Sequence, residues 1–238
     1  IEVPLPDRRG REGILAVHAR DVPLADDVDL TLIARRTPGF SGAQLQKVLQ
    51  EAALRAHRAG RETINRYDLD EAVAVVVLGV PRMSAVVTDH DRTVTAWHEA
   101  GHTLAALLLP DAPKPAAVSI IPRGSAGGAT WMTETDSAFF TRQEARARMT
   151  VMMSGQVAER ILLKGDFTQG ASHDLSRATE LAEAMVGSFG MSEAIPAVRR
   201  PRRDGSWDPE VQVEVDSLVA GARDAATALL TDHEESLK

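Results

Sequence analysis

The chain has 238 residues, of which 44% are hydrophobic and 26% charged, a globular composition with room for one large domain or two modest ones. Its net charge of −7 at pH 7 argues against nucleic-acid binding as the main role. The chain contains no cysteine, which excludes disulfides and thiolate metal sites and leaves His, Asp and Glu as the metal ligands to consider.

No apolar run approaches the roughly 18 residues that a membrane helix needs, and no signal peptide is recognisable. The longest apolar run, over residues 72–80, is about half that length. The chain begins at Ile1, within an extended stretch, so we interpret it as a fragment of a longer protein. Its lack of a membrane segment therefore says little about the parent protein.

The first 80 residues predict a small helical bundle. Four segments with helical apolar spacing, separated by Pro and Gly, begin near residues 13, 28, 41 and 68. Ser41 is the expected cap of the third helix and Asp68 that of the fourth. The polar stretch over residues 81–89 is the expected linker to a second domain.

A histidine pair follows this linker. His98 and His102 are four residues apart, and Glu99 comes directly after the first of them. On an α-helix this spacing puts both imidazoles on one face, about 40° apart around the axis, where they can bind one metal ion. Glu99 would then act as general base on a metal-bound water. Capping residues before the helix and Pro110 after it support the helix, although two surface histidines on an ordinary helix are the alternative.

The remaining chain predicts a mainly α domain with a small β-hairpin or edge sheet. Strand composition occurs over residues 117–122 and 129–133, around a glycine-rich turn. Three further helices are expected over residues 143–164, 174–189 and 210–238, the first capped by Thr141.

A catalytic zinc site needs a third protein ligand. Asp174, at the expected start of a helix, is the best candidate, although an acid there can also serve only the helix dipole. Glu159, Glu180 and Glu183 are rival ligands. Zinc suits two imidazoles and a carboxylate, but other divalent ions fit them too.

Several motifs occur in the order and approximate spacing of one known family. Those of the first domain lie at residues 7–12, 37–43 and 51–54, and those of the second at 98–102, 119–124, 154–159 and 170–175. On these motifs, nearly the whole chain resembles the FtsH family of membrane-anchored, ATP-dependent zinc metalloproteases. The His-Glu-Ala-Gly-His sequence over residues 98–102 is identical to the zinc motif of that family.

The resemblance implies that His98, His102 and Asp174 bind Zn²⁺ and that Glu99 is the catalytic base. Residues 1–80 would be the end of an AAA ATPase module with its helical lid, and residues 90–238 a peptidase domain. The expected activity is hydrolysis of unfolded or membrane-extracted polypeptides by a homo-hexamer. The parent protein would be membrane-anchored, with this part on the cytoplasmic side.

The same resemblance places the segment around Gly42 and Ala43 near ATP. The chain has no GxxxxGK[ST] loop and no acidic Walker-B strand, so ATP hydrolysis would belong to the N-terminal part of the parent. Gly128, Ala129 and Thr130 would belong to an edge on which an extended substrate adds as a strand, or to a plain core strand.

Two departures from the family pattern are visible. His173 stands where the family usually has Asn, and residues 195–203 diverge and look shortened, so a loop near the site differs. The alternative function is a catalytically silent homologue that serves as an oligomerisation or adaptor module.

Overall fold

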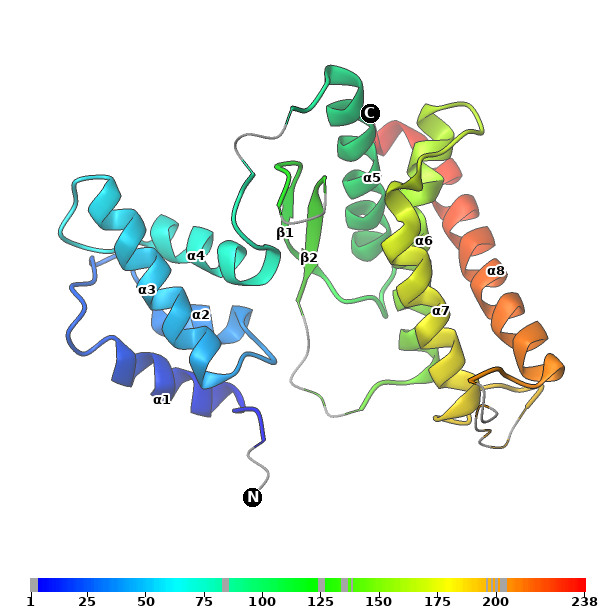
Figure 1. The fold of residues 1–238 in the computed structure, drawn as a ribbon, viewed down its shortest axis with the longest axis horizontal. Helices are drawn as coiled ribbons and strands as arrows, with labels where there is room; N and C mark the ends of the chain where they lie inside the picture. Colours follow the sequence, from blue (N-terminus) through cyan, green and yellow to red (C-terminus); the bar gives the residue numbers. More distant parts are fainter. Residues whose placement is uncertain are drawn as a thin grey trace. The chain divides into compact units, whose positions relative to one another are not determined.

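The computed structural model describes residues 4–82, 86–123, 127–133, 137, 139–195, 197, 199, 201 and 205–238. Within these ranges it contains eight α-helices and one two-stranded sheet, which confirms the expected mainly α class (Figure 1). The chain divides into two compact units. Unit 1 comprises residues 1–85 and 121–138, and unit 2 comprises residues 86–120 and 139–238.

Unit 1 is built on four helices: α1 (Arg8–His18), α2 (Leu30–Arg36), α3 (Gly42–Arg58) and α4 (Arg66–Leu78). Helix α3 packs against α1 and α4, and α1 also packs against α2. The apolar positions that repeat at helical spacing are the ones that become buried, among them Leu15, Ile33, Leu45, Val48 and Leu69. The expected bundle of short helices is therefore present.

Two helix starts in unit 1 differ from the sequence-based expectation. Helix α1 begins at Arg8, five residues before the expected start, because the Asp7 side chain caps it by accepting a hydrogen bond from Gly10 N–H. Helix α4 begins at Arg66, and its cap is Asn65 rather than Asp68. Asp68 lies three residues later and accepts from the Asn65 N–H, so the two side chains form a capping box.

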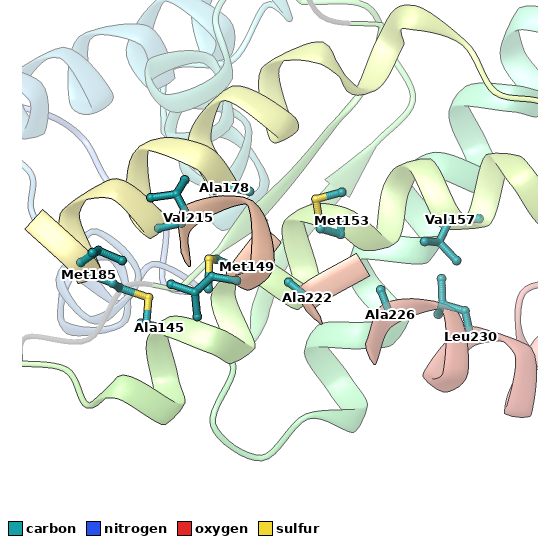
Figure 2. Close-up of a cluster of buried hydrophobic side chains, with 14 of the residues drawn as sticks. Ala145, Met149, Met153, Val157, Ala178, Met185, Val215, Ala222, Ala226 and Leu230 are labelled. Carbon is teal, nitrogen blue, oxygen red and sulfur yellow. The ribbon is translucent and has the colours of Figure 1, made fainter. Parts of the chain in front are cut away.

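Unit 2 contains α5 (Asp89–Leu108), α6 (Arg142–Leu162), α7 (Ser172–Gly187) and α8 (Pro209–Asp232), with short 3₁₀ turns at Gln169–Ala171 and Glu234–Ser236. Helix α6 packs against the other three. Its inward side chains form one apolar cluster with those of α7 and α8, shown in Figure 2 as Ala145, Met149, Met153, Val157, Ala178, Met185, Val215, Ala222, Ala226 and Leu230. Alanine and valine are the commonest residues of the buried cluster, followed by methionine and leucine.

Helices α5 and α6 approach each other closely at Gly101. A Cβ atom on Gly101 would lie 2.4 Å from the Ser154 carbonyl oxygen and 2.7 Å from the Ala158 Cβ. Only a residue without a side chain permits this backbone separation. The close approach brings the turn of α5 that carries the two histidines against the middle of α6.

The sheet pairs β1 (Pro115–Ser119) with β2 (Ala129–Met132). Strand β1 ends three residues before the expected limit, next to a segment in which Pro122 has no N–H to donate and restricts the residue before it. Residues 124–126 of the expected glycine-rich turn and residues 83–85 of the expected linker lie outside the described residues. Among the helices in the described ranges, none has the length and hydropathy of a membrane span.

Candidate metal centre

Helix α5 forms around the histidine pair for local reasons. Thr88 caps it by accepting a hydrogen bond from Asp91 N–H, and Asp91 accepts from Thr88 in return. The helix ends at Leu108, two residues before Pro110. His98 and His102 therefore lie one turn apart on the same helical face, as their spacing predicts.

Three donor atoms from two helices converge at this face. His98 Nε2 lies 3.0 Å from His102 Nε2, and Asp174 Oδ2 lies 3.1 Å from the first and 3.2 Å from the second. Ligands about 2.0–2.1 Å from a tetrahedral zinc ion are about 3.3 Å apart. The three atoms are thus close to the spacing of three zinc ligands. They form the one group of such side chains found within the part of the chain that the structure describes.

The outer nitrogen of each imidazole already has a partner. His98 Nδ1 lies 2.8 Å from Glu159 Oε1, and His102 Nδ1 lies 2.7 Å from the Val151 carbonyl oxygen. Both partners are acceptors, so each Nδ1 carries a proton and donates it. This arrangement orients both rings with Nε2 toward Asp174, as carboxylate and carbonyl partners do in histidine–metal sites.

The carboxylates considered as rival ligands lie elsewhere. Glu159 accepts hydrogen bonds from His98 Nδ1 and from Thr168 N–H, which leaves it outside the group of three donors. Glu180 is exposed on α7 and Glu183 is half-buried on the same helix. Asp174, in the first turn of α7, is the carboxylate next to the imidazoles, and its distance of 72 residues from His102 is closed by the packing of α6 against α5 and α7.

The electrostatics of the group are strongly coupled. Burial opposes a charge on His98, but hydrogen bonds to Asp174 and Glu159 raise its pKa to about 9. Burial opposes the charge on Asp174 as well, and the hydrogen bonds from His102 and His98 hold its pKa well below the usual range. Glu159 behaves in the same way: burial opposes its charge, yet its pKa is lowered by His98 and Thr168.

The other residues expected at functional sites lie on helices α5 and α3 and at strand β2. Glu99 is 5% exposed and follows His98 on α5. Gly42 and Ala43 form the first turn of α3, behind the Ser41 cap, while Gly128 is half-buried and precedes Ala129 and Thr130 in β2.

The sequence departs from the family pattern at two places, and the structure describes the first of them but only part of the second. His173 is exposed to solvent. Most of the basic stretch of the divergent loop, including residues 200, 202 and 203, lies outside the described residues.

Sequence reasoning missed three contributions from α6. It considered Glu159 as a ligand rather than as the partner of a ligand, and it assigned no role to the Val151 carbonyl or to Gly155. These residues are four apart, so their spacing is the signal that they share one face of α6. A spacing alone does not show which element that face meets.

Comparisons with known proteins identify the families to which the two parts of the chain are similar. The family model of peptidase family M41 matches residues 85–238, and that of the AAA+ lid domain matches residues 27–71. An ATP-dependent zinc metalloprotease FtsH of Veillonella parvula is 41% identical over 249 residues, which cover 98% of this chain and 39% of the relative. FtsH 4 of Sphaerobacter thermophilus is 45% identical over 199 residues, covering 83% of this chain and 30% of the relative.

A third relative extends the match to the whole chain. FtsH 4 of Sorangium cellulosum is 41% identical over 257 residues, covering 100% of this chain and 40% of the relative. The chain thus spans about two fifths or less of the length of these relatives. The matches confirm the resemblance to the FtsH family that the motifs indicated. The chain belongs to peptidase family M41, with an AAA+ lid domain preceding the peptidase part.

Proposed function

We propose that this chain is the peptidase part of an ATP-dependent zinc endopeptidase, in which His98, His102 and Asp174 hold the metal. The observation that carries the proposal is the convergence of two Nε2 atoms and one carboxylate oxygen within 3.0–3.2 Å of one another. The donor set of two imidazoles and a carboxylate is one that catalytic zinc uses, with a further position left for water.

A zinc ion held by His98, His102 and Asp174 would supply a bound water of lowered pKa and would polarise the scissile carbonyl. Glu99 would accept the proton of that water and pass it to the leaving amine. Its position directly after His98 on a rigid helix holds the carboxylate beside the ligand group, and its burial keeps bulk water from competing for the proton. His98 and His102 act through their Nε2 atoms, while Glu159 and Val151 keep both rings oriented.

We also propose the organisation of the parent protein. Residues 1–80 are the end of an AAA module with its lid, residues 81–89 a linker and residues 90–238 the peptidase domain. Support comes from the lid match at residues 27–71 and from relatives named as ATP-dependent zinc metalloproteases. ATP then drives polypeptide substrates, unfolded or extracted from a membrane, into a homo-hexameric ring anchored on the cytoplasmic side of that membrane.

Two further sites belong to this proposal. Gly42 and Ala43, at the N-terminal turn of α3, would lie near the nucleotide of the AAA module, since the N-terminus of a helix suits a phosphate. Gly128, Ala129 and Thr130 would bind an extended substrate through backbone hydrogen bonds along β2.

The test compares the full-length protein with its Glu99→Gln variant, using metal analysis and casein degradation in the presence of ATP. We expect both proteins to contain about one zinc per chain and only the wild type to cleave casein, because Gln keeps the shape of Glu99 but cannot accept a proton. Equal degradation of casein by the two proteins would contradict the peptidase assignment. Absence of cleavage by the wild type under the same conditions would favour the silent adaptor module.

A further inference from the structure

One face of α6 meets both candidate ligand histidines. Val151, Gly155 and Glu159 follow one another at intervals of one turn, and the outer two accept hydrogen bonds from His102 and His98. Between these two contacts, the middle position carries no side chain. We propose that Gly155 is a positioning residue of the metal centre, whose missing side chain provides the space in which the two Nε2 atoms reach one ion. This inference rests on the proposed function.

The space above Gly155 is occupied by the ligand atoms themselves. A Cβ atom added to Gly155 would lie 2.6 Å from His102 Nε2, from His98 Nε2 and from His98 Cε1. Ordinary contact between such atoms begins at about 3.5 Å, so both rings would have to move by about 0.9 Å. A metal site tolerates about 0.2 Å in its ligand distances. The displacement is therefore several times larger than the site can absorb.

Neither ring can make this movement without losing other contacts. Each Nδ1 is held by α6 within one turn of Gly155, at 2.7 Å for His102 and 2.8 Å for His98. A ring pushed away from Gly155 stretches or breaks that hydrogen bond, so the methyl group would disturb both imidazoles at once. His102 is 7% exposed, which leaves it little free space nearby.

Backbone conformation does not explain the glycine. Gly155 lies inside a regular helix, and it is absent from the described glycines with a positive φ. At such a position glycine is less favourable than alanine by about 1 kcal/mol. What requires glycine here is the space for the imidazoles.

Another crowded glycine provides a matched control. A Cβ on Gly187, at the end of α7, would lie 2.4 Å from the ring of Trp207, a clash as severe as that at Gly155. Trp207 is a packing residue and not one of the three donors, so Gly187→Ala tests the cost of steric crowding without touching the ligands.

The experiment uses the full-length protein, its Gly155→Ala variant and its Gly187→Ala variant. Zinc affinity is measured by competition with a chromophoric chelator, and folding by circular dichroism in excess chelator. We expect Gly155→Ala to keep its helical signal and to bind zinc at least about 100-fold more weakly, beyond the usual effect of an outer-shell change. With Co²⁺ as the probe, its visible absorption band should shift or disappear. Gly187→Ala should keep the zinc affinity and the cobalt spectrum of the wild type.

The contrary results distinguish a failure of this inference from a failure of the proposed function. Zinc affinity of Gly155→Ala within about threefold of the wild type, with an unchanged cobalt spectrum, would overturn the inference and leave the proposed function intact. Loss of the helical signal in chelator would also overturn it, because the glycine would then be required for packing. Equal weakening in both variants would lead to the same conclusion. A wild-type protein that binds no zinc would instead contradict the proposed function.

Discussion

The carboxylate of Glu159 contacts His98 on the side away from Asp174, so any effect of Glu159 on a metal ion would pass through that imidazole. It accepts from the Nδ1 of His98 at 2.8 Å and is itself held by the Thr168 N–H at 2.7 Å. With 1% exposure, its charge is little screened by solvent. A carboxylate in this position fixes the orientation of the imidazole and makes its other nitrogen a better ligand.

Replacement of Glu159 by Gln tests this role. Gln keeps an acceptor oxygen for His98 but loses the charge, so we expect zinc affinity to fall by about 10- to 100-fold while the fold is retained. Chelator competition measures the change. Glu180→Gln, at an exposed position of α7, is the control and should bind zinc like the wild type. Unchanged affinity in Glu159→Gln would show that the carboxylate does not act on the ligand.

At the scale of the element, the start of a helix depends on its capping residues, and a sequence can contain several candidate caps for one helix. Asn65 and Asp68 can each begin α4, and the structure uses both in a capping box. Arg61 also holds the Asp68 side chain in this position. Its guanidinium donates to both oxygens of the buried Asp68 carboxylate, at 2.6 and 2.7 Å. The pKa of Asp68 is lowered by this contact in spite of its burial.

Asp68 should therefore make the stability of the helical bundle in unit 1 depend on pH. Because its pKa is lower in the folded state, the stabilisation is present above the ordinary Asp value of about 3.9 and is lost as the pH falls through the folded value. We expect Asp68→Asn to lower the unfolding free energy by about 1–3 kcal/mol at pH 7, toward the lower end because Arg61 is 35% exposed.

Urea unfolding at pH 7 and near pH 3 measures this effect. The difference between wild type and Asp68→Asn should shrink at the lower pH, because below the ordinary Asp pKa the unfolded chain binds a proton at Asp68 more readily than the folded chain does. Asp70→Asn, whose carboxylate is 37% exposed, is the control and should show a smaller difference at pH 7. A difference independent of pH would contradict the role of the Asp68 charge.

A substitution in helix α8 should raise the unfolding free energy rather than lower it. Gly221 is exposed within the helix, and a Cβ atom there would meet nothing within 4 Å. Gly221→Ala should raise the unfolding free energy by about 0.5–1 kcal/mol, because alanine loses less backbone freedom on folding. Thermal unfolding measures the gain. Gly187→Ala, where the Cβ would meet Trp207, should lower stability in the same assay. Destabilisation by Gly221→Ala would contradict the geometry of α8.

For the whole molecule, the two units should respond differently to metal. His98, His102 and Asp174 all belong to unit 2. A ligand that binds only the folded state adds RT ln(1 + [L]/Kd), about 2.7 kcal/mol at a free zinc concentration 100 times Kd. We expect a chelator to lower the melting temperature of unit 2 and to leave that of unit 1 unchanged.

Differential scanning calorimetry with and without chelator tests this expectation. A His98→Ala variant is the control, because its unit 2 should melt at one temperature whether or not zinc is present. Equal shifts of both transitions, or a shift that persists in the variant, would contradict a metal site confined to unit 2.

Much of the fold follows from local patterns in the sequence. The helix that carries His98 and His102 is specified by its capping box and its apolar spacing, and the distance between the two histidines along it is a property of any α-helix. The same reasoning located the helices of both units, but it misplaced the start of α1 and the cap of α4. Several polar residues near a helix start can cap it, and contacts with other residues, such as that of Arg61 with Asp68, contribute to which one does.

The sequence by itself thus determined the helical framework and the face on which two imidazoles meet. Only the tertiary structure decided which carboxylate lies beside them. From the residues alone Asp174 and Glu159 were rivals, and the packing of α6 and α7 against α5 places the first at the inner nitrogens and the second at an outer one. The same packing decided that Gly155 lies beneath both rings. The physical reason is that helix formation depends on residues within a few turns, whereas these contacts join segments separated by about fifty or more residues, and their geometry depends on how close whole helices approach.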